Sequence, residues 1–178
     1  MSVQVKHRRD TAANIALFTP AQGEILVDTD NNRLIVGDGA TAGGIPAAKQ
    51  SEVGRVTSPA GATFSLNIAE VLISGLSGAN VHAASLIPAG AQVMGCASRV
   101  VTAITGATSF EVGYGSGGTL SAFGSGLGLS AGSINEGLIG PATFYAATDV
   151  IVTAAGSNFT GGAVRLSLAY LTLTAATS

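Results

Sequence analysis

The chain has 178 residues, which is enough for one medium domain or two small ones, and its net charge is −2. Charged residues make up only 10% of the sequence and hydrophobic residues 47%, against a charged share of about 25% in typical soluble proteins. This balance gives no basic footprint for nucleic acid or an anionic membrane, and no apolar run approaches the roughly 18–20 residues of a membrane helix.

The scarcity of charge indicates that other chains cover part of the surface, because buried interfaces are depleted in charged residues. The alternative is a monomer whose surface is wetted by Ser, Thr, Asn and Gly. The basic segment Lys6-His7-Arg8-Arg9 near the N-terminus is not followed by an apolar run, so no secretory signal is expected. We therefore expect synthesis in a cytoplasm, without membrane insertion.

Charge is distributed unevenly along the chain. Residues 1–55 contain twelve of the eighteen charged residues, and residues 56–178 contain the other six. The sequence Ser58-Pro59-Ala60-Gly61, which is typical of a turn or linker, lies close to this change. We therefore expect two domains, 1–55 and 56–178.

The first part is predicted to contain a β-hairpin. Short apolar runs at 24–28 and 33–37 flank Thr29-Asp30-Asn31-Asn32. Asp and Asn tolerate left-handed backbone and bond to their own chain, so these four residues favour a tight turn. Gly37-Asp38-Gly39 predicts a second turn. Asp10 or Thr11 is suited to cap a short helical turn that begins after it.

The spacing Asp28-x-Asp30-x-Asn32 also opens like a calcium-binding loop. Such a loop needs glycine at its sixth position and an acidic residue at its twelfth, where this sequence has Arg33 and Gly39. The hairpin turn is the better interpretation, and no metal site is expected.

The second part shows period-2 alternation of apolar with small or polar residues nearly throughout. The alternating apolar residues are Phe64, Leu66 and Ile68; Phe110, Val112 and Tyr114; and Val164, Leu166 and Leu168. At Leu171 and Leu173 the apolar phase shifts by one, which indicates a bulge or a change of covering surface. Short strands, frequent glycine turns and no sustained helical period predict a β-sandwich of jelly-roll type.

Residues 113–132 are rich in glycine, but apolar residues recur through them. Glycine allows sharp turns, so this pattern predicts a folded surface loop, and long loops in compact domains are often functional. Tyr114 and Phe123 are our candidate receptor contacts in this loop. The alternative is that the loop packs on a neighbouring subunit.

Two segments match motifs known from enzymes, but the sequence around them lacks the other elements that these motifs require. Gly128-Leu129-Ser130-Ala131-Gly132 matches G-x-S-x-G, but that motif needs a following helix and a downstream histidine. The two histidines, His7 and His82, both precede it. Residues 113–118 match G-x-G-x-x-G, again with no helix to receive a phosphate.

Cys96 is the single cysteine, so no intrachain disulfide is possible, and its apolar surroundings predict a buried side chain.

Residues 7–46 resemble the N-terminal domain of phage receptor-binding proteins of the major tropism determinant type, which many phage fibre proteins carry. The matching segments are Arg8–Asn14, Gly23–Asp30, Arg33–Thr41 and Gly44–Pro46. Ile15 departs from the family, which often has Trp there. The resemblance implies a small β module that trimerises and joins a fibre to the virion, with Arg8, Arg9 and Asp10 as our candidate docking residues.

Residues 62–175 are similar, over shorter segments, to C-terminal β domains of tail-fibre or head-spike proteins of phages. The segments are Ile87–Ala91, Ala103–Phe110 and Phe159–Leu166. Together the two resemblances imply an all-β homotrimer: a small β-hairpin or prism-like module followed by a jelly-roll-like sandwich.

Three functions are compatible with the sequence. The first is a non-enzymatic virion fibre or spike, made in a bacterial host, attached to other phage capsid or tail proteins and contacting a host-surface glycan or receptor. The second is a capsid decoration protein or head fibre that stabilises the virion without receptor recognition. The third is a depolymerase or esterase, against which the sparse acidic residues Glu70, Glu111, Glu136 and Asp149 argue. No cofactor or nucleic-acid partner is expected.

Overall fold

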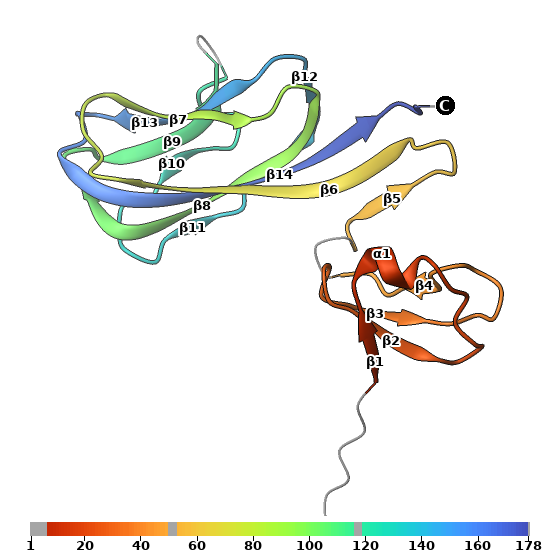
Figure 1. The fold of residues 1–178 in the computed structure, drawn as a ribbon. Helices are drawn as coiled ribbons and strands as arrows, with labels where there is room; N and C mark the ends of the chain where they lie inside the picture. The colour runs from red at the N-terminus through yellow and green to blue at the C-terminus, as the bar shows by residue number, and fades with distance from the viewer. Residues whose placement is uncertain (1–6, 50–52, 116–118, 178) are drawn as a thin grey trace, which may run out of the picture. The chain divides into compact units, whose positions relative to one another are not determined.

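The structure is a computed structural model that describes residues 7–49, 53–115 and 119–177 (Figure 1). Within these residues it contains fourteen strands and one short helix, so the prediction of an all-β chain is confirmed. The chain divides into two compact units, Met1–Val53 and Gly54–Ser178, two residues before the expected division. Each unit is described by itself below.

The N-terminal unit is a four-stranded sheet with one helical turn. Its elements are β1 (Arg8–Asp10), α1 (Ala12–Ile15), β2 (Ile25–Asp28), β3 (Arg33–Val36) and β4 (Ile45–Pro46). The strands lie in the order β1-β2-β3-β4, with β1 parallel to β2 and the other pairs antiparallel. Ile15, Leu26 and Ile35 form the buried core, and Phe18 packs against it.

The predicted hairpin and helical turn are both confirmed. β2 pairs with β3 from Ile25↔Val36 to Asp28↔Arg33, and Asn32 in the turn between them has a φ of 48°. An asparagine tolerates this left-handed conformation better than most residues. Thr11 is the N-cap of α1, where its hydroxyl accepts a hydrogen bond from the backbone N–H of Asn14.

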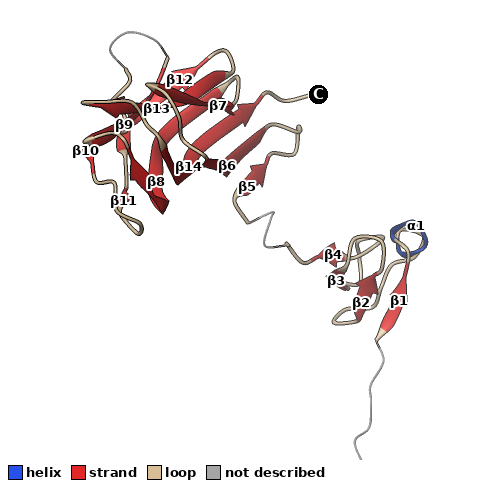
Figure 2. Ribbon diagram, turned by 90° about the vertical axis from the view of Figure 1, so that its left-hand side faces the viewer, coloured by secondary structure: helices blue, strands red, loops and turns tan. Residues whose placement is uncertain are grey.

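The second unit consists of ten strands in two sheets. They are β5 (Arg55–Thr57), β6 (Thr63–Ser74), β7 (Asn80–Ile87), β8 (Ala91–Thr105), β9 (Ser109–Tyr114), β10 (Gly124–Leu127), β11 (Ile134–Asn135), β12 (Leu138–Phe144), β13 (Thr148–Ala155) and β14 (Gly161–Thr174). One sheet has the order β10-β9-β13-β7 and the other the order β11-β8-β14-β6-β5, with β12 also pairing β8. Figure 2 shows these strands as two layers.

The strand pairs are nested, which makes this unit a jelly roll. β6 pairs with β14, β7 with β13, β8 with β11 and β12, and β9 with β10, all antiparallel. A long hairpin folded over on itself gives this nesting and places alternate pairs in two facing sheets. The predicted jelly-roll-like sandwich is therefore the topology of the second unit.

The core of the jelly roll lies between the two sheets. Val164, Leu166 and Leu168, which alternate along β14, are fully buried there, and they meet Val150 and Val152 of the facing sheet in one cluster. Full burial of such side chains contributes about 1.5–3 kcal/mol each. Cys96 joins the same cluster, and its burial raises the pKa of the thiol to about 12.

Candidate functional site

The predicted docking residues lie on β1, the edge strand of the N-terminal sheet. The guanidinium carbon of Arg8 lies 3.8 Å from the centroid of the Phe18 ring, a cation–π contact. The side chain of Arg9 is exposed. Asp10 Oδ1 accepts hydrogen bonds from Thr11 N at 2.9 Å and Asn14 Nδ2 at 2.7 Å. Asp10 therefore holds the start of α1, and the docking role of the three residues stays a prediction.

The described aspartates of the N-terminal unit accept hydrogen bonds from their own chain. Asp28 Oδ1 accepts from the backbone N–H groups of Asp30 and Asn31, and Asp28 Oδ2 accepts from Asn31 Nδ2 at 2.8 Å. The Asn31 side chain, together with these amides, holds the pKa of Asp28 below its usual value. Asp30 Oδ2 accepts from Ala12 N at 3.0 Å. The spacing that opened like a calcium loop thus serves to tie the hairpin turn to α1.

Asp38 orders the next turn in the same way, by accepting hydrogen bonds from the residues that follow it. It accepts hydrogen bonds from the Thr41 hydroxyl and from the backbone N–H groups of Ala40 and Thr41. The Thr41 hydroxyl, followed by the two amides, lowers the pKa of Asp38 from 3.8 to about 2. Gly37 is required beside it, because a Cβ there would lie 2.1 Å from the carbonyl oxygen of Ala21.

Neither of the two predicted receptor contacts, Tyr114 and Phe123, is a fully exposed side chain. The Phe123 ring is 2% exposed and belongs to the jelly-roll core, so the expectation that it lies on the surface is wrong. Its chain is tied down at both sides, since Phe123 N donates to Val112 O and Asn135 Nδ2 donates to Phe123 O. The half-buried Tyr114 ring packs 5.6 Å from Phe123 and 4.7 Å from Phe144, centroid to centroid. A receptor role for Tyr114 is untested.

Sequence reasoning misplaced Phe123 because glycine-rich segments are usually exposed. Here glycine has the opposite effect, since it lets the returning chain approach β9 closely. A Cβ on Gly113 would lie 2.0 Å from the carbonyl oxygen of Thr119. Leu127 and Leu129 of the same segment also pack against the core. The signal available in the sequence was the recurrence of apolar residues, which predicted a folded segment.

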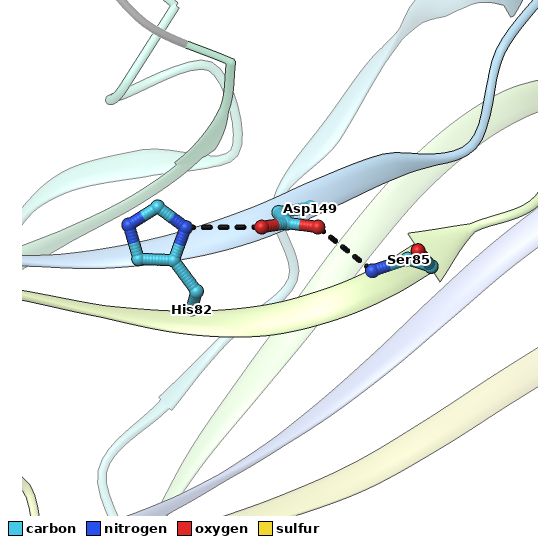
Figure 3. A network of polar contacts seen from close by, with 3 residues as sticks. All are labelled: His82, Ser85 and Asp149. Atoms are coloured by element: carbon cyan, nitrogen blue, oxygen red, sulfur yellow. Dashed lines mark hydrogen bonds and ion pairs between the residues drawn. The ribbon is translucent and has the colours of Figure 1, made fainter.

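A polar network links β7 and β13 (Figure 3). His82 Nδ1 lies 3.0 Å from Asp149 Oδ2, and Ser85 N donates to Asp149 Oδ1 at 2.8 Å. The hydrogen bond from Ser85 N, followed by that from His82, lowers the pKa of Asp149. The register of these strands shifts between Thr148 and Val150, and Ser85 has a φ of 51°. Asp149 therefore stabilises an irregular backbone, which is a structural role.

The outer side of the six-stranded sheet carries a row of exposed apolar side chains. On β6, Phe64 is 44% exposed, Leu66 63% and Ile68 76%. Their alternation was evident in the sequence, but it follows the outer face, while Val71 and Ile73 further along the same strand pack against the core. Period-2 alternation shows that two faces differ without showing which one is buried, so the sequence could not place this row.

This exposed surface continues onto the neighbouring strands. Register pairs Leu171 with Leu66, Leu173 with Phe64, and Val56 of β5 also with Phe64. We call the set Val56, Phe64, Leu66, Ile68, Leu171 and Leu173 the apolar end. The phase shift at Leu171 and Leu173 is thus a change of covering surface, and a bulge also interrupts the β14–β8 pairing between Ala169 and Tyr170.

The opposite end of the same outer face carries an ion pair beside Leu72, which is 46% exposed and pairs in register with Arg165. Arg165 Nη1 lies 2.7 Å from Glu70 Oε1, and the Ser167 hydroxyl donates to Glu70 Oε2 at 3.1 Å. Both charged side chains are nearly half exposed. We call Glu70, Arg165 and Ser167 the polar end.

The two segments that match enzyme motifs were not expected to be catalytic, and the structure can be checked for the helix that such motifs need. Residues 128–132 form the turn between β10 and β11, and no helix follows them in the described part of the second unit. The match at 113–118 extends over 116–118, which lie outside the described residues. Among the residues that the structure describes, no group of His, Cys, Asp and Glu could hold a metal ion. No helix of that part of the chain is long and apolar enough to cross a membrane.

Comparison with known proteins bears on the N-terminal unit. Residues 5–41 match the family described as the major tropism determinant N-terminal domain. The resemblance predicted from the sequence is confirmed there. In addition, 53 residues of the chain are 53% identical to the tail fiber receptor-binding protein of Bordetella phage BPP-1. This match covers 30% of the chain and 14% of that relative, so the chain is similar to only a small part of it.

Two solved structures show weaker likeness. The acidic stable capsid structure of Helicobacter pylori bacteriophage KHP30 contains a chain that is 17% identical, with a TM-score of 0.44, 67% of this chain covered and 94% of that one. The P3c variant of the major tropism determinant is 28% identical with a TM-score of 0.27, over 55% of this chain and 29% of that one. These TM-scores carry no conclusion about function. The resemblance of residues 62–175 to spike domains stays a prediction.

The N-terminal unit is similar to the major tropism determinant domain, and Ile15, the residue at which the sequence departs from the resemblance, lies in its core. Ile15 is buried against Leu26 and Ile35. An apolar side chain smaller than the Trp that the resemblance implied therefore occupies this position, and the unit has its sheet and its capped helical turn.

Proposed function

We propose that this protein is a non-enzymatic component of a bacteriophage virion, a short homotrimeric fibre or spike. The N-terminal unit attaches to other capsid or tail proteins of the particle. The jelly-roll unit projects and contacts a glycan or receptor on the host surface. The protein is made in the cytoplasm of the bacterial host and assembled onto the particle there.

The match of residues 5–41 to the major tropism determinant N-terminal domain carries this proposal. It is supported by the 53% identity over 53 residues to a tail fiber receptor-binding protein. The hairpin turn and capped helical turn of the unit are built from residues inside the matched range, Thr11, Asp28 and Asp38 among them. The similarity therefore includes the residues that fix the backbone of this unit.

The jelly-roll unit supports a binding role through its architecture. Jelly rolls recur in lectin domains and viral capsids, where a rigid sandwich presents loops at its ends. Three copies on one fibre, and many fibres on one particle, convert weak individual contacts into strong attachment through effective concentration. A charge-poor surface suits contact with a neutral glycan.

The proposal is tested by deleting the gene from the phage that encodes it. Purified wild-type particles are expected to contain the protein, and particles without it are expected to adsorb to host cells at least about tenfold more slowly. Binding of the purified full-length protein to host cells, with competition by envelope glycans, checks the receptor contact directly. Absence of the protein from purified particles would contradict the proposal.

The same deletion separates the fibre from a capsid decoration protein. A decoration protein stabilises the capsid, so its loss is expected to lower the temperature at which the capsid opens while adsorption stays normal. Polysaccharide cleavage by the purified protein that is abolished by Glu111→Gln or Glu136→Gln would instead establish an enzyme.

A further inference from the structure

The outer face of the four-stranded sheet carries a row of polar side chains that crosses three strands. Val152 of β13 is fully buried in the core, and side chains alternate along a strand, so the next residue, Thr153, faces outward. Thr153 pairs in register with Asn80 of β7 on one side and with Glu111 of β9 on the other. Residues directly across from each other share a face, so an amide, a hydroxyl and a carboxylate lie side by side.

The protein itself makes no use of these three side-chain groups. In the described part of the chain, no hydrogen bond or ion pair engages the Asn80 amide or the half-buried Glu111 carboxylate, and the buried Thr153 Oγ1 has no hydrogen-bond partner. Polar groups withdrawn from water without a partner are rare in native proteins and call for an explanation. A ligand that supplies hydrogen bonds at this face is such an explanation.

Glu111 differs in this respect from the other carboxylates that the structure describes. Every described aspartate, and Glu24 and Glu70 as well, accepts a hydrogen bond from its own chain. Glu136 does not, but its side chain is exposed and water can solvate it. Among the described residues, Glu111 is therefore the one half-buried carboxylate that its own chain leaves without a partner.

An apolar side chain and an imidazole lie next to this polar row. Ile151 of β13, one pair further along the same face, is only 6% exposed although it points outward. His82 lies directly across from Ile151, and one nitrogen of its ring contacts Asp149 while the other faces away (Figure 3). On the other side the chain crosses the outer face, since a Cβ on Gly113, which pairs with Ile151, would lie 2.0 Å from the carbonyl oxygen of Thr119.

This combination of groups suits a neutral glycan. Sugar hydroxyls both donate and accept hydrogen bonds, so they can satisfy a carboxylate, an amide and an imidazole at once, while ring carbons contact an apolar side chain. The set spans about 10 Å across three strands and about 7 Å along them, which is enough for one or two sugar rings. The carboxylates of Glu111 and Asp149 would repel an anionic polysaccharide.

We propose that this outer face, at Asn80, His82, Glu111 and Ile151, binds a neutral glycan of the host envelope. Glu111 accepts hydrogen bonds from sugar hydroxyls, Asn80 donates and accepts them, and Ile151 contacts the ring carbons. The inference rests on the proposed function, in which the jelly-roll unit contacts the host surface, and it adds the face that makes the contact and the class of ligand.

Binding of the full-length protein to polysaccharide released from the host envelope tests this inference. Asn80→Ala removes the amide and Glu111→Gln removes the charge but keeps the shape, so each is expected to weaken binding at least about fivefold. Glu136→Gln is the matched control, because it makes the same chemical change on an exposed side chain between β11 and β12, and it should bind as the parent does. Thermal unfolding of each variant verifies that it folds as the parent does.

Intact host cells serve as a second ligand and separate the remaining cases. Polysaccharide binding that both Asn80→Ala and Glu111→Gln retain in full would overturn the inference and leave the proposed function intact. Binding to cells that protease treatment abolishes, with none to the polysaccharide, would point to a protein receptor and would also overturn the inference alone. Absence of binding to either ligand would contradict both the inference and the receptor contact of the proposed function.

Discussion

The two units keep their backbones in place by different means. In the N-terminal unit, the buried cluster consists of Ile15, Leu26 and Ile35, and the turns are held by aspartate carboxylates that accept backbone hydrogen bonds. In the jelly-roll unit, long strands enclose a much larger apolar cluster, and β6 pairs with β14 over twelve consecutive residues. Local polar contacts dominate in the first and long-range apolar packing in the second.

This difference follows from size. A unit of about fifty residues buries a smaller fraction of its surface than a larger one, so apolar packing alone leaves its stability marginal. Hydrogen bonds between a carboxylate and the two or three residues after it order a turn at a small entropic cost, since the partners are already close in sequence. The larger unit has apolar residues to spare, and the apolar end is the excess.

The largest expected effect comes from the jelly-roll core. Phe123→Ala removes a buried ring and leaves a cavity, so we expect it to lower the free energy of unfolding of the second unit by about 3–5 kcal/mol. Denaturant unfolding followed by tyrosine signals reports on this unit alone, because Tyr114, Tyr145 and Tyr170 all belong to it. Tyr145→Ala is the control, since that ring is 90% exposed. Equal stabilities of the two variants would show that Phe123 is not a core residue.

The next effect is in the N-terminal unit. Gly37→Ala places a methyl group against the Ala21 carbonyl, which is backbone and cannot move aside, so we expect a loss of about 1–3 kcal/mol in this unit. Amide hydrogen exchange within β2 and β3 measures it, and the tyrosine transition should stay unchanged. Gly140→Ala is a control in the other unit, because a Cβ there meets nothing within 4 Å, and it should leave both the exchange of β2 and β3 and the tyrosine transition unchanged. A neutral Gly37→Ala variant would contradict the close approach at this turn.

Acid should weaken the N-terminal unit more than the jelly roll. Three of its aspartates, Asp10, Asp28 and Asp38, have lowered pKa values, against Asp149 in the second unit. A carboxyl whose pKa is lower in the folded state binds its proton more readily when unfolded. The contribution of Asp38 is therefore complete above its unfolded pKa of 3.8 and is lost as the pH falls toward 2.

An NMR titration of the Thr41 amide measures this effect, and Asp38→Asn should remove most of the acid dependence of that signal. Sensitivity that persists in Asp38→Asn would assign the acid response to another group.

The smallest effect belongs to the polar end. Glu70 and Arg165 are both partly exposed, so their ion pair is expected to contribute only about 0.2–1 kcal/mol. A double-mutant cycle with Glu70→Gln and Arg165→Met measures the coupling in urea. A coupling well above about 1 kcal/mol would contradict this estimate and would show that solvent does not screen the pair.

Local features could be predicted from the sequence because neighbouring residues determine them. The turn at Thr29–Asn32 and the cap at Thr11 depend on side chains that reach only a few residues along the chain. The all-β class followed from alternation and from the absence of a helical period. The burial of Phe123 could not be predicted, because it depends on Asn135 and Val112, which the fold brings to it.

The sequence by itself determined the β class, the uneven distribution of charge, the N-terminal resemblance and the shift of apolar phase at Leu171. The tertiary structure decided which face of each strand is covered. It turned Phe64, Leu66 and Ile68 outward and Phe123 inward. The physical reason is that alternation specifies two faces by their difference, whereas burial depends on the sheet that packs opposite, and that sheet is formed by residues distant in the chain.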